Sequence, residues 1–467
     1  MKKCGIILII LIFIPFFRVS ADSGGYLIKI KDDFPIELYE SELEEINADK
    51  KIYSTQNEDL LEDLNEYIET TTPNSCIDLI EGFESISLFN STENEPQSHP
   101  WQLDMVNVTG AWDLKTYGNN VKVAVIDSGC HPHEALNGNL LPGKNYFDET
   151  EDVSDNIGHG THVSGIIAAE LDCLEIIGTA PKAKIVPLKC FDSNKSSTMD
   201  MIIQAIYDAV DIYNCQIINM SWGVNSDNEF LKEAIKYAHD KGVILVAAVG
   251  NNYSKALYYP AAYECVIGVG SVTSTKSKSS FSQHNESVFV VAPGSNILST
   301  YKNGGYKKLS GTSQATPMVS GLAAILLSID ATKTPNDFQE LLLSTSEDLG
   351  DPGYDTDFGY GLINVDLFIK KVLENKSIYI SPFCDDDDSS GVYYFNLTDE
   401  EQDVFCIKAY YDDYKMNTCT FENIKLFGSE PFFYECEDPT SDIKYMAWKN
   451  LNILAPLGNS RTIKNIN

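Results

Sequence analysis

Strand-like and helix-like segments alternate along the middle of this chain, and this alternation restricts its possible folds more than any other feature. Short apolar runs rich in β-branched residues are separated by longer segments whose apolar residues have helical spacing. The expected segments are 121–126, 185–189, 199–213, 217–220, 230–241, 243–249, 266–269 and 289–292, with closing helices at 337–343 and 368–373. This pattern is typical of an α/β fold with a parallel sheet between layers of helices.

Three glycine-flanked motifs place an aspartate, a histidine and a serine in that order. Asp127 ends the first apolar run, His159 lies in Gly-His-Gly-Thr-His-Val-Ser-Gly, and Ser313 lies in Gly-Thr-Ser-Gln-Ala-Thr-Pro. His159 and Ser313 each precede an apolar stretch, so we expect both at helix starts, with Thr312 and Ser313 as capping residues. A carboxylate, an imidazole and a hydroxyl are the groups that nucleophilic acyl transfer requires.

These motifs and their order resemble those of the subtilisin-like serine proteases. The resemblance implies a serine endopeptidase with the subtilisin-like three-layer fold. In it Ser313 would be the nucleophile, His159 the general base and Asp127 the residue that orients the imidazole. It also implies protein or peptide substrates, and we expect a monomer.

Further residues match substrate-binding positions of that family. Asn251 matches the residue whose amide forms the oxyanion hole together with the backbone N–H of the nucleophile. Ser221, Trp222 and Gly223 match a segment that pairs with the substrate main chain as an added strand, although they also suit a core strand. Tyr258 matches the base of the first substrate pocket, where a phenol would favour small residues at the cleaved position.

Residues 1–21 have the organisation of a secretory signal peptide. Two lysines are followed by a thirteen-residue apolar run, 5–17, and by the small-residue cleavage motif Val19-Ser20-Ala21. The run is too short to cross a bilayer comfortably, and the one later apolar stretch belongs to the expected nucleophile helix. We therefore expect a secreted protein with no membrane span once the signal is removed.

Residues 22–97 are expected to form an inhibitory, folding-assisting propeptide and its linker. Residues 22–100 hold 20 acidic and 4 basic residues, almost half of the net charge of −34. Their strand-like and helix-like segments at 26–31, 60–68 and 77–88 resemble the small α/β propeptide of secreted relatives. We expect self-cleavage between Leu88 and Trp101. The acidic composition also argues against nucleic-acid binding.

The catalytic domain is expected at 98–376 and a small β-rich domain at 377–467. The tail has short alternating segments and Cys384, Cys406, Cys419 and Cys436, which could form two disulfides in an exported module. Its role is left open between stabilising the enzyme and binding substrate or a surface. The catalytic domain itself has five cysteines, so at least one cannot pair within it.

Other polar residues are expected to be structural. His162 lies three residues after His159, but a metal held by both would occupy the catalytic base. His131 and His133 are expected in a solvated loop. Cys130 is not expected to be a nucleophile, because a neighbouring carboxylate would raise the pKa of its thiol.

The resemblance implies no required cofactor and leaves calcium binding open. The family's calcium loop is poorly matched in 170–178, where only Asp172 is a plausible ligand, and the acidic run 385–388 lacks calcium-loop spacing. Gln314 and Met318 depart from the Met and His usual beside the nucleophile, but neither is a triad position.

Three functions fit these residues: a general degradative endopeptidase, a dedicated processing protease of the leader-peptide type, and an inactive binding homologue. The third is disfavoured because no triad member is missing.

Overall fold

The structure is a computed structural model that describes most of the chain between residues 25 and 463. The described residues are 25–31, 39, 43–48, 50–57, 60–61, 64, 67–78, 100–171, 173, 175–374, 376, 378–384, 390–397, 402–412, 415–426, 431–436, 442–450, 453–456 and 461–463. The expected signal peptide, residues 79–97 of the expected propeptide and linker, Asp172 and the acidic run 385–388 lie outside them.

The chain divides into two compact units, and the first consists of Met1–Cys76 with Thr198–Asp200. It contains a four-stranded antiparallel sheet in the order β2-β3-β1-β4. These strands are β1 (Tyr26–Ile30), β2 (Glu44–Asn47), β3 (Ile52–Thr55) and β4 (Ile68–Pro73). A small core joins one face of the sheet to the segment from residue 60, where Leu64 N–H donates to the Leu60 carbonyl as in a helix. The expected α/β character of this segment is thus confirmed for its described residues.

The second unit is built on a seven-stranded parallel sheet in the order β13-β12-β11-β10-β6-β8-β7. Its strands are β6 (Lys122–Asp127), β7 (Lys144–Asn145), β8 (Lys184–Lys189), β10 (Ile217–Met220), β11 (Ile244–Ala248), β12 (Ile267–Val272) and β13 (Val290–Pro293). Each strand predicted for this sheet is present, and its first residue lies within one or two residues of the predicted start. The runs of β-branched residues are buried almost without interruption, as in a sheet covered on both faces.

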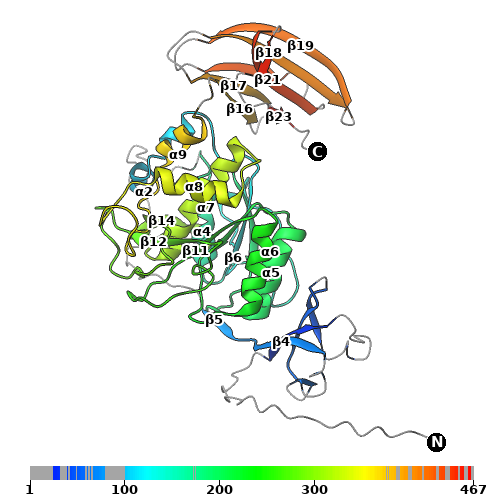
Figure 1. The fold of residues 1–467 in the computed structure, drawn as a ribbon, viewed down its shortest axis with the longest axis vertical. Helices are drawn as coiled ribbons and strands as arrows, with labels where there is room; N and C mark the ends of the chain where they lie inside the picture. The colour runs from blue at the N-terminus through cyan, green and yellow to red at the C-terminus, as the bar shows by residue number, and fades with distance from the viewer. Residues whose placement is uncertain are drawn as a thin grey trace, which may run out of the picture. The chain divides into compact units, whose positions relative to one another are not determined.

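Helices flank this sheet, and the three-layer α/β prediction is confirmed (Figure 1). The principal helices are α4 (His159–Ala168), α5 (Met199–Asp211), α6 (Glu229–Asp240), α7 (Thr312–Ile329), α8 (Pro335–Thr345) and α9 (Val365–Val372). Strand β11 contacts both α6 and α7, α4 packs against α7, and α5 and α6 lie side by side.

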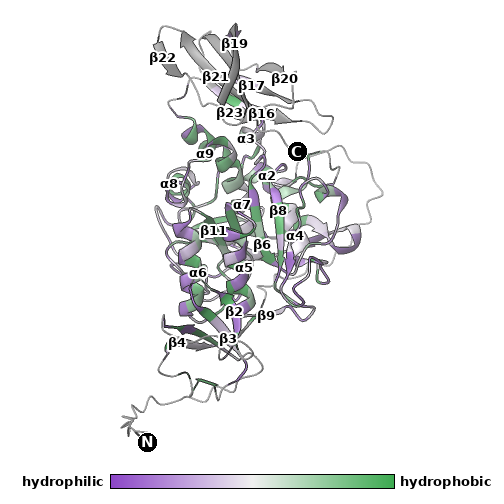
Figure 2. Ribbon diagram, turned by 90° about the vertical axis from the view of Figure 1, so that its right-hand side faces the viewer, coloured by the Kyte–Doolittle hydropathy of each residue, from purple (hydrophilic) through white to green (hydrophobic). Residues whose placement is uncertain are grey.

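Local sequence explains where these helices begin. The Asn228 side chain accepts hydrogen bonds from the first N–H groups of α6, and a Thr334 and Asp337 capping box begins α8. Along α6 hydrophilic and hydrophobic residues alternate, whereas β11 is hydrophobic throughout (Figure 2). The amphipathic helix therefore covers a fully apolar strand.

Smaller elements complete the second unit. Among them is an antiparallel hairpin of β14 (Ile297–Tyr301) and β15 (Gly305–Leu309), which the sequence pattern did not predict. The other short elements of the chain are β5 (Cys76–Asp78), α2 (Trp101–Met105), α3 (Thr109–Trp112), η2 (Glu134–Leu136), β9 (Ser196–Thr198) and η3 (Lys302–Gly304).

The tail is rich in β-structure, as predicted. A three-stranded sheet contains β16 (Ile378–Cys384), β17 (Ser390–Asn396) and β20 (Phe432–Cys436). A five-stranded sheet contains β18 (Gln402–Asp412), β19 (Lys415–Leu426), β21 (Asp442–Asn450), β22 (Ile453–Pro456) and β23 (Arg461–Ile463). The side chains of the four tail cysteines lie outside the description, so their pairing stays a prediction.

One described helix, α7, has the length and apolar composition of a membrane span. It is 94% buried inside the protein, which is the environment of a core helix.

Candidate active site

Asp127 is the last residue of β6, an interior strand paired with β10 on one side and β8 on the other. Its side chain is fully buried. The predicted position at the carboxyl end of a parallel strand is confirmed. This is where open α/β sheets place their ligand sites.

His159 is the first residue of α4, as predicted, and follows Gly158 in the left-handed region at φ 94°. Its Nδ1 lies 2.8 Å from Oδ1 and 3.0 Å from Oδ2 of Asp127. Because a carboxylate only accepts, Nδ1 carries the proton and Nε2 is the basic nitrogen. A Cβ on Gly160 would lie 2.2 Å from the Gly129 carbonyl oxygen, so glycine permits this approach of α4 to the β6 loop.

Ser313 is the second residue of α7 and is fully buried. Its hydroxyl donates to the Ser221 carbonyl at 3.1 Å, and the Ser221 hydroxyl donates to the Ser313 carbonyl at 3.0 Å. The expected helix start is confirmed, but the expected capping role is wrong. The N-cap is Gly311, which has no side chain to cap with, and the Thr312 side chain bonds to Asn251 instead.

Asn251 follows β11 after Gly250, which has φ 112°. Its Oδ1 accepts from the backbone N–H of Thr312 at 2.9 Å and from the Thr312 hydroxyl at 3.0 Å. A backbone N–H can only donate, so these contacts fix the amide orientation and identify Nδ2 as its donor end. The structure thereby places Asn251, the predicted oxyanion residue, in contact with Thr312, which directly precedes Ser313.

The segment Ser221, Trp222 and Gly223 follows β10 at the same edge of the sheet. The Ser221 and Trp222 side chains are fully buried, and the Trp222 ring packs near Phe191. Beyond the segment, Val224 exchanges two backbone hydrogen bonds of 2.8 Å with Tyr259. The side chains of Ser221 and Trp222 therefore belong to the core.

Tyr258 lies close to the two residues that flank Asn251, the predicted oxyanion residue. A Cβ on Gly250 would lie 3.3 Å from Tyr258 Cδ2, and the Asn252 side chain donates to the Tyr258 hydroxyl at 2.6 Å. The segment between Asn251 and Tyr258 is held by Gln283, whose fully buried amide forms hydrogen bonds with Ser254 and with the Ala256 carbonyl.

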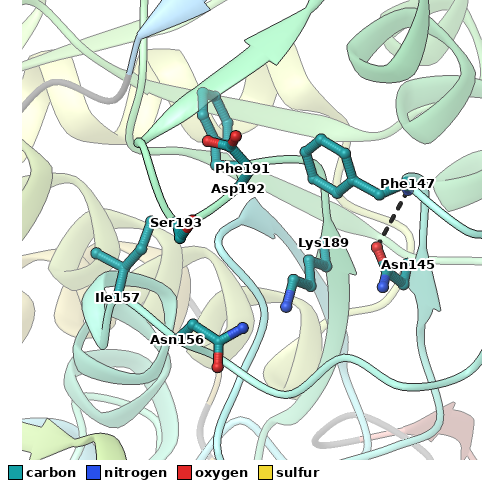
Figure 3. Close-up of a pocket in the computed structure, with 8 residues that line it drawn as sticks. All are labelled: Asn145, Phe147, Asn156, Ile157, Lys189, Phe191, Asp192 and Ser193. Atoms are coloured by element: carbon teal, nitrogen blue, oxygen red, sulfur yellow. Dashed lines mark hydrogen bonds between the residues drawn. The ribbon is translucent and has the colours of Figure 1, made fainter.

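A pocket of about 250 Å³ opens at the carboxyl end of β8. Phe147, Asn145 and Lys189 lie on one side of it, and Ser193, Ile157 and Asn156 on the other (Figure 3). Two residues that line the pocket are linked to Asp127 and His159, one by a hydrogen bond and one by its position in the sequence. Phe191, also in its lining, donates its N–H to the Asp127 carbonyl at 3.3 Å, and Ile157 is two residues before His159.

His162 is structural in the sense predicted. It is fully buried, and its Nε2 bridges the Ile297 and Lys307 carbonyls at 3.1 and 3.0 Å. Burial, with a smaller contribution from the charge on His159, lowers the pKa of His162 to about 3.

The prediction that His133 lies in a solvated loop is wrong. It is 2% exposed, begins η2 by accepting from Ala135 N–H, and contacts the Gly305 carbonyl at 3.1 Å. The unpredicted β14–β15 hairpin carries Gly305, and this tertiary contact covers the histidine. His131 is partly exposed.

The thiol chemistry agrees with the sequence. Cys130, Cys173, Cys215 and Cys265 are free thiols. The pKa of Cys130 is raised to about 12, mainly by burial, with Asp127 among the smaller causes. Its direction was predicted, but burial outweighs the neighbouring carboxylate.

Gln314 and Met318, the two unusual neighbours of Ser313, are both fully buried. Neither polar atom of the Gln314 amide has a hydrogen-bond partner among the described residues. An unpaired buried amide is costly, which makes this position a weak point of the helix start.

Among the described residues there is no cluster of three or more potential metal ligands. Asp172 lies outside the description, so calcium binding there stays a prediction. The Glu170 carboxylate in the same segment already accepts from Gly138 N–H.

Sequence reasoning missed Asp155, a carboxylate in the turn before α4 that is 2% exposed. It accepts hydrogen bonds from the segments on both sides of His159 and from Ser128. The available signal was an acidic residue shortly before a helix start whose own N-cap is glycine.

Comparisons with known proteins agree with this geometry. A profile of the Subtilase family matches residues 118–361. The chain is 36% identical to Subtilisin DY of Bacillus licheniformis over 275 residues, 58% of this chain and 98% of that protein. It is 39% identical to the Minor extracellular protease Epr of Bacillus subtilis over 277 residues, which covers 59% of this chain but only 42% of Epr. It is also 42% identical to the Major intracellular serine protease of Bacillus subtilis over 242 residues, 50% of this chain and 76% of that protein.

Proposed function

Because this chain belongs to the subtilase family and is a subtilisin-like serine endopeptidase, we propose that Ser313, His159 and Asp127 form its catalytic triad. The observation that carries this assignment is the 2.8 Å contact between His159 Nδ1 and Asp127 Oδ1. It holds the imidazole in the tautomer whose Nε2 can accept a proton.

In the proposed reaction the Ser313 hydroxyl turns from the Ser221 carbonyl to His159 Nε2. The oxygen attacks the scissile peptide carbonyl while the proton passes to Nε2. The same proton then goes to the leaving amine, and an acyl-enzyme remains. Water repeats the two steps, so that the acid product leaves and Ser313 is restored. Buried Asp127 stabilises the imidazolium in both halves.

The oxyanion would be held by Asn251 Nδ2 and the Ser313 backbone N–H. The two contacts of Asn251 Oδ1 with Thr312 support this, because they direct the amide before the substrate arrives. Ser313 also lies at the start of the eighteen-residue helix α7, where free N–H groups and the helix dipole favour negative charge.

Substrate would bind as an added strand along the main chain of Ser221 to Gly223. The backbone pairing of Val224 with Tyr259 supports this by limiting the available edge to the residues before it. We further propose that the pocket beside Lys189 receives a substrate side chain, and that Tyr258 limits the size of the residue at the cleaved position.

We propose that the enzyme is secreted as a zymogen whose residues 22–97 are removed by self-cleavage. The separate folded unit with its own core supports this, and so does the name of one relative, the Minor extracellular protease Epr. An intracellular relative also matches, so the N-terminal sequence of exported protein is the direct check. Residues before Ala21 on the mature form would contradict removal of the signal.

The central experiment is a peptide-library cleavage profile of the purified enzyme with Ser313→Ala as its control. We expect the variant to lose cleavage by about 10⁴-fold or more and to accumulate as uncleaved precursor. Broad cleavage by the unsubstituted enzyme indicates a degradative role, and a single motif indicates processing. Retained cleavage or normal maturation in Ser313→Ala would refute the assigned nucleophile.

A further inference from the structure

Asp155 is a buried carboxylate that joins two segments of the site. Its hydrogen bonds connect the turn and helix that carry His159 to the residue after Asp127. Its Oδ1 accepts from Ser128 Oγ at 2.9 Å, Ile157 N–H at 2.9 Å and Gly158 N–H at 2.7 Å. Its Oδ2 accepts from Thr161 N–H at 2.9 Å and Thr161 Oγ1 at 2.7 Å. These contacts use the whole accepting capacity of a carboxylate.

Two of these donors enclose His159 in the chain. Gly158 N–H comes just before the histidine, and Thr161 N–H comes two residues after it. The N-cap of α4 is Gly158, which has no side chain, so Asp155 supplies the oxygen that a capping residue would normally provide. Its negative charge also suits the positive end of the helix dipole.

The same carboxylate reaches the Asp127 side of the site through Ser128. The Ser128 hydroxyl donates to Asp155 and accepts from Gly160 N–H at 3.0 Å, while Ser128 N–H donates to Asp127 Oδ1 at 2.7 Å. The Thr161 hydroxyl adds a second connection by accepting from His131 N–H at 2.9 Å. The start of α4 is therefore tied to the β6 loop independently of the direct His159 and Asp127 contact.

We propose that Asp155 is a positioning residue that fixes the His159 imidazole for proton transfer and, through Ile157, fixes one wall of the adjacent pocket. This rests on the proposed function, in which His159 is the general base. A rigid turn is needed because an imidazole displaced by about 1 Å costs roughly 100-fold in rate. Asp155 touches neither substrate nor the reacting atoms and acts only through the residues it holds.

The matched control is Asp355, a half-buried aspartate in a turn distant in sequence from the triad. Its carboxylate also accepts several backbone N–H groups, from Asp351 at 3.1 Å and from Asp357 and Phe358 at 2.8 Å each. Asp155→Asn and Asp355→Asn make the same chemical change at comparable turns. The Asp355 variant therefore shows what the loss of a carboxylate that accepts from turn N–H groups does away from the triad.

The experiment compares kcat, KM and the pH profile of the two variants and the unsubstituted enzyme, each corrected for its folded fraction. Each precursor is first cleaved by a small amount of affinity-tagged active enzyme, which is then removed by means of its tag. For Asp155→Asn we expect kcat to fall about 10- to 100-fold with a smaller change in KM. For Asp355→Asn we expect both constants to stay unchanged.

The pH profile gives a readout that a merely structural role would not move. The ionisable neighbours of His159 identified in the structure are Asp127 from β6, His162 from α4 and Asp155 from the preceding turn. Removing the Asp155 charge takes an attraction away from the imidazolium, so the acid limb should move to lower pH. If folded Asp155→Asn has the same kcat and the same pH profile as the unsubstituted enzyme, the proposal is overturned.

Two milder variants keep the test decisive if Asp155→Asn does not fold. Ser128→Ala and Thr161→Val each remove one hydroxyl donor and leave the carboxylate, so we expect smaller kcat losses in the same direction. Unchanged kcat in both would overturn the proposal. Ser313→Ala separates the two levels: if that variant still cleaves, the proposed function fails, whereas a dead Ser313→Ala with a normal Asp155→Asn refutes only the role of Asp155.

Discussion

The two principal sheets of this protein bury their strands in different ways. Side chains of β4 in the first unit alternate between half-buried and exposed, whereas those of β10 and β11 in the second unit are buried along the whole strand. The edge strand β4 exposes one face, although the interior strand β3 of the same sheet is buried along its length, and the parallel sheet is flanked by helices. The polar residues Asp127, Ser221 and Asn251 all lie at or just beyond the carboxyl ends of its strands.

This difference indicates that the same kind of substitution should act differently in the two sheets. At the ends of parallel strands a lost polar group should lower activity. Inside those strands a lost methyl group should lower stability. On β2 and β4, the edge strands of the antiparallel sheet, both changes should have small and local effects.

Among the substitutions that compare the two sheets, Asn251→Ala should have the largest effect. Loss of one oxyanion donor should lower kcat about 10²- to 10³-fold with little change in KM. Asn47→Ala is the matched change in the antiparallel sheet, where Asn47 accepts from Lys50 N–H. Steady-state kinetics of processed enzyme should show no change in kcat for Asn47→Ala. Similar losses in the two variants would break the comparison.

Val246→Ala and a matched truncation in the antiparallel sheet should lower the free energy of unfolding by different amounts. Val246 is fully buried in β11, so its truncation should cost about 2 kcal/mol in the free energy of unfolding. Thr71→Ala on an exposed position of β4 should cost less than about 0.5 kcal/mol. Denaturant unfolding of the precursor measures both, and equal costs would contradict the assigned burial.

Acid should destabilise the second unit through His162. Burial holds the pKa of His162 at about 3, below its ordinary value of 6.5, so between these values the unfolded chain binds the proton first. Stability should therefore fall as pH decreases through this window, by up to about 1.4 kcal/mol per pH unit. Residues 1–76 contain no histidine, so their sheet lacks this contribution. His162→Gln should flatten the slope of unfolding free energy against pH, and an unchanged slope would contradict the role of this residue.

The smallest effect should be a gain from Gln314→Met. Replacing an unpaired buried amide by a thioether of similar length should raise the free energy of unfolding by about 1 kcal/mol. Gln283→Met is the matched control, because that equally buried amide is paired with Ser254 and Ala256 and its loss should destabilise. Calorimetry that shows the same sign for both would refute this account of Gln314.

The fold was predictable because each element has a local signal of its own. Apolar β-branched runs gave β6, β8, β10 and β11, and amphipathic spacing gave α5 and α6. The β14–β15 hairpin was missed because β15 contains two lysines and only its last residue is buried, so it lacks an apolar run. The burial of His133 was missed for the same reason, since that hairpin supplies its cover.

The sequence by itself determined the types and order of the reacting groups and the strand or helix end on which each one stands. Local periodicity and glycine-flanked motifs suffice for that. Only the tertiary structure decided which polar groups meet. Asp127 and His159 are 32 residues apart, Ser221 and Ser313 are 92 apart, and Asp155 joins Ser128 to the start of α4. Such hydrogen bonds depend on ångström-scale distances that arise when helices pack on the sheet, and no local pattern encodes them.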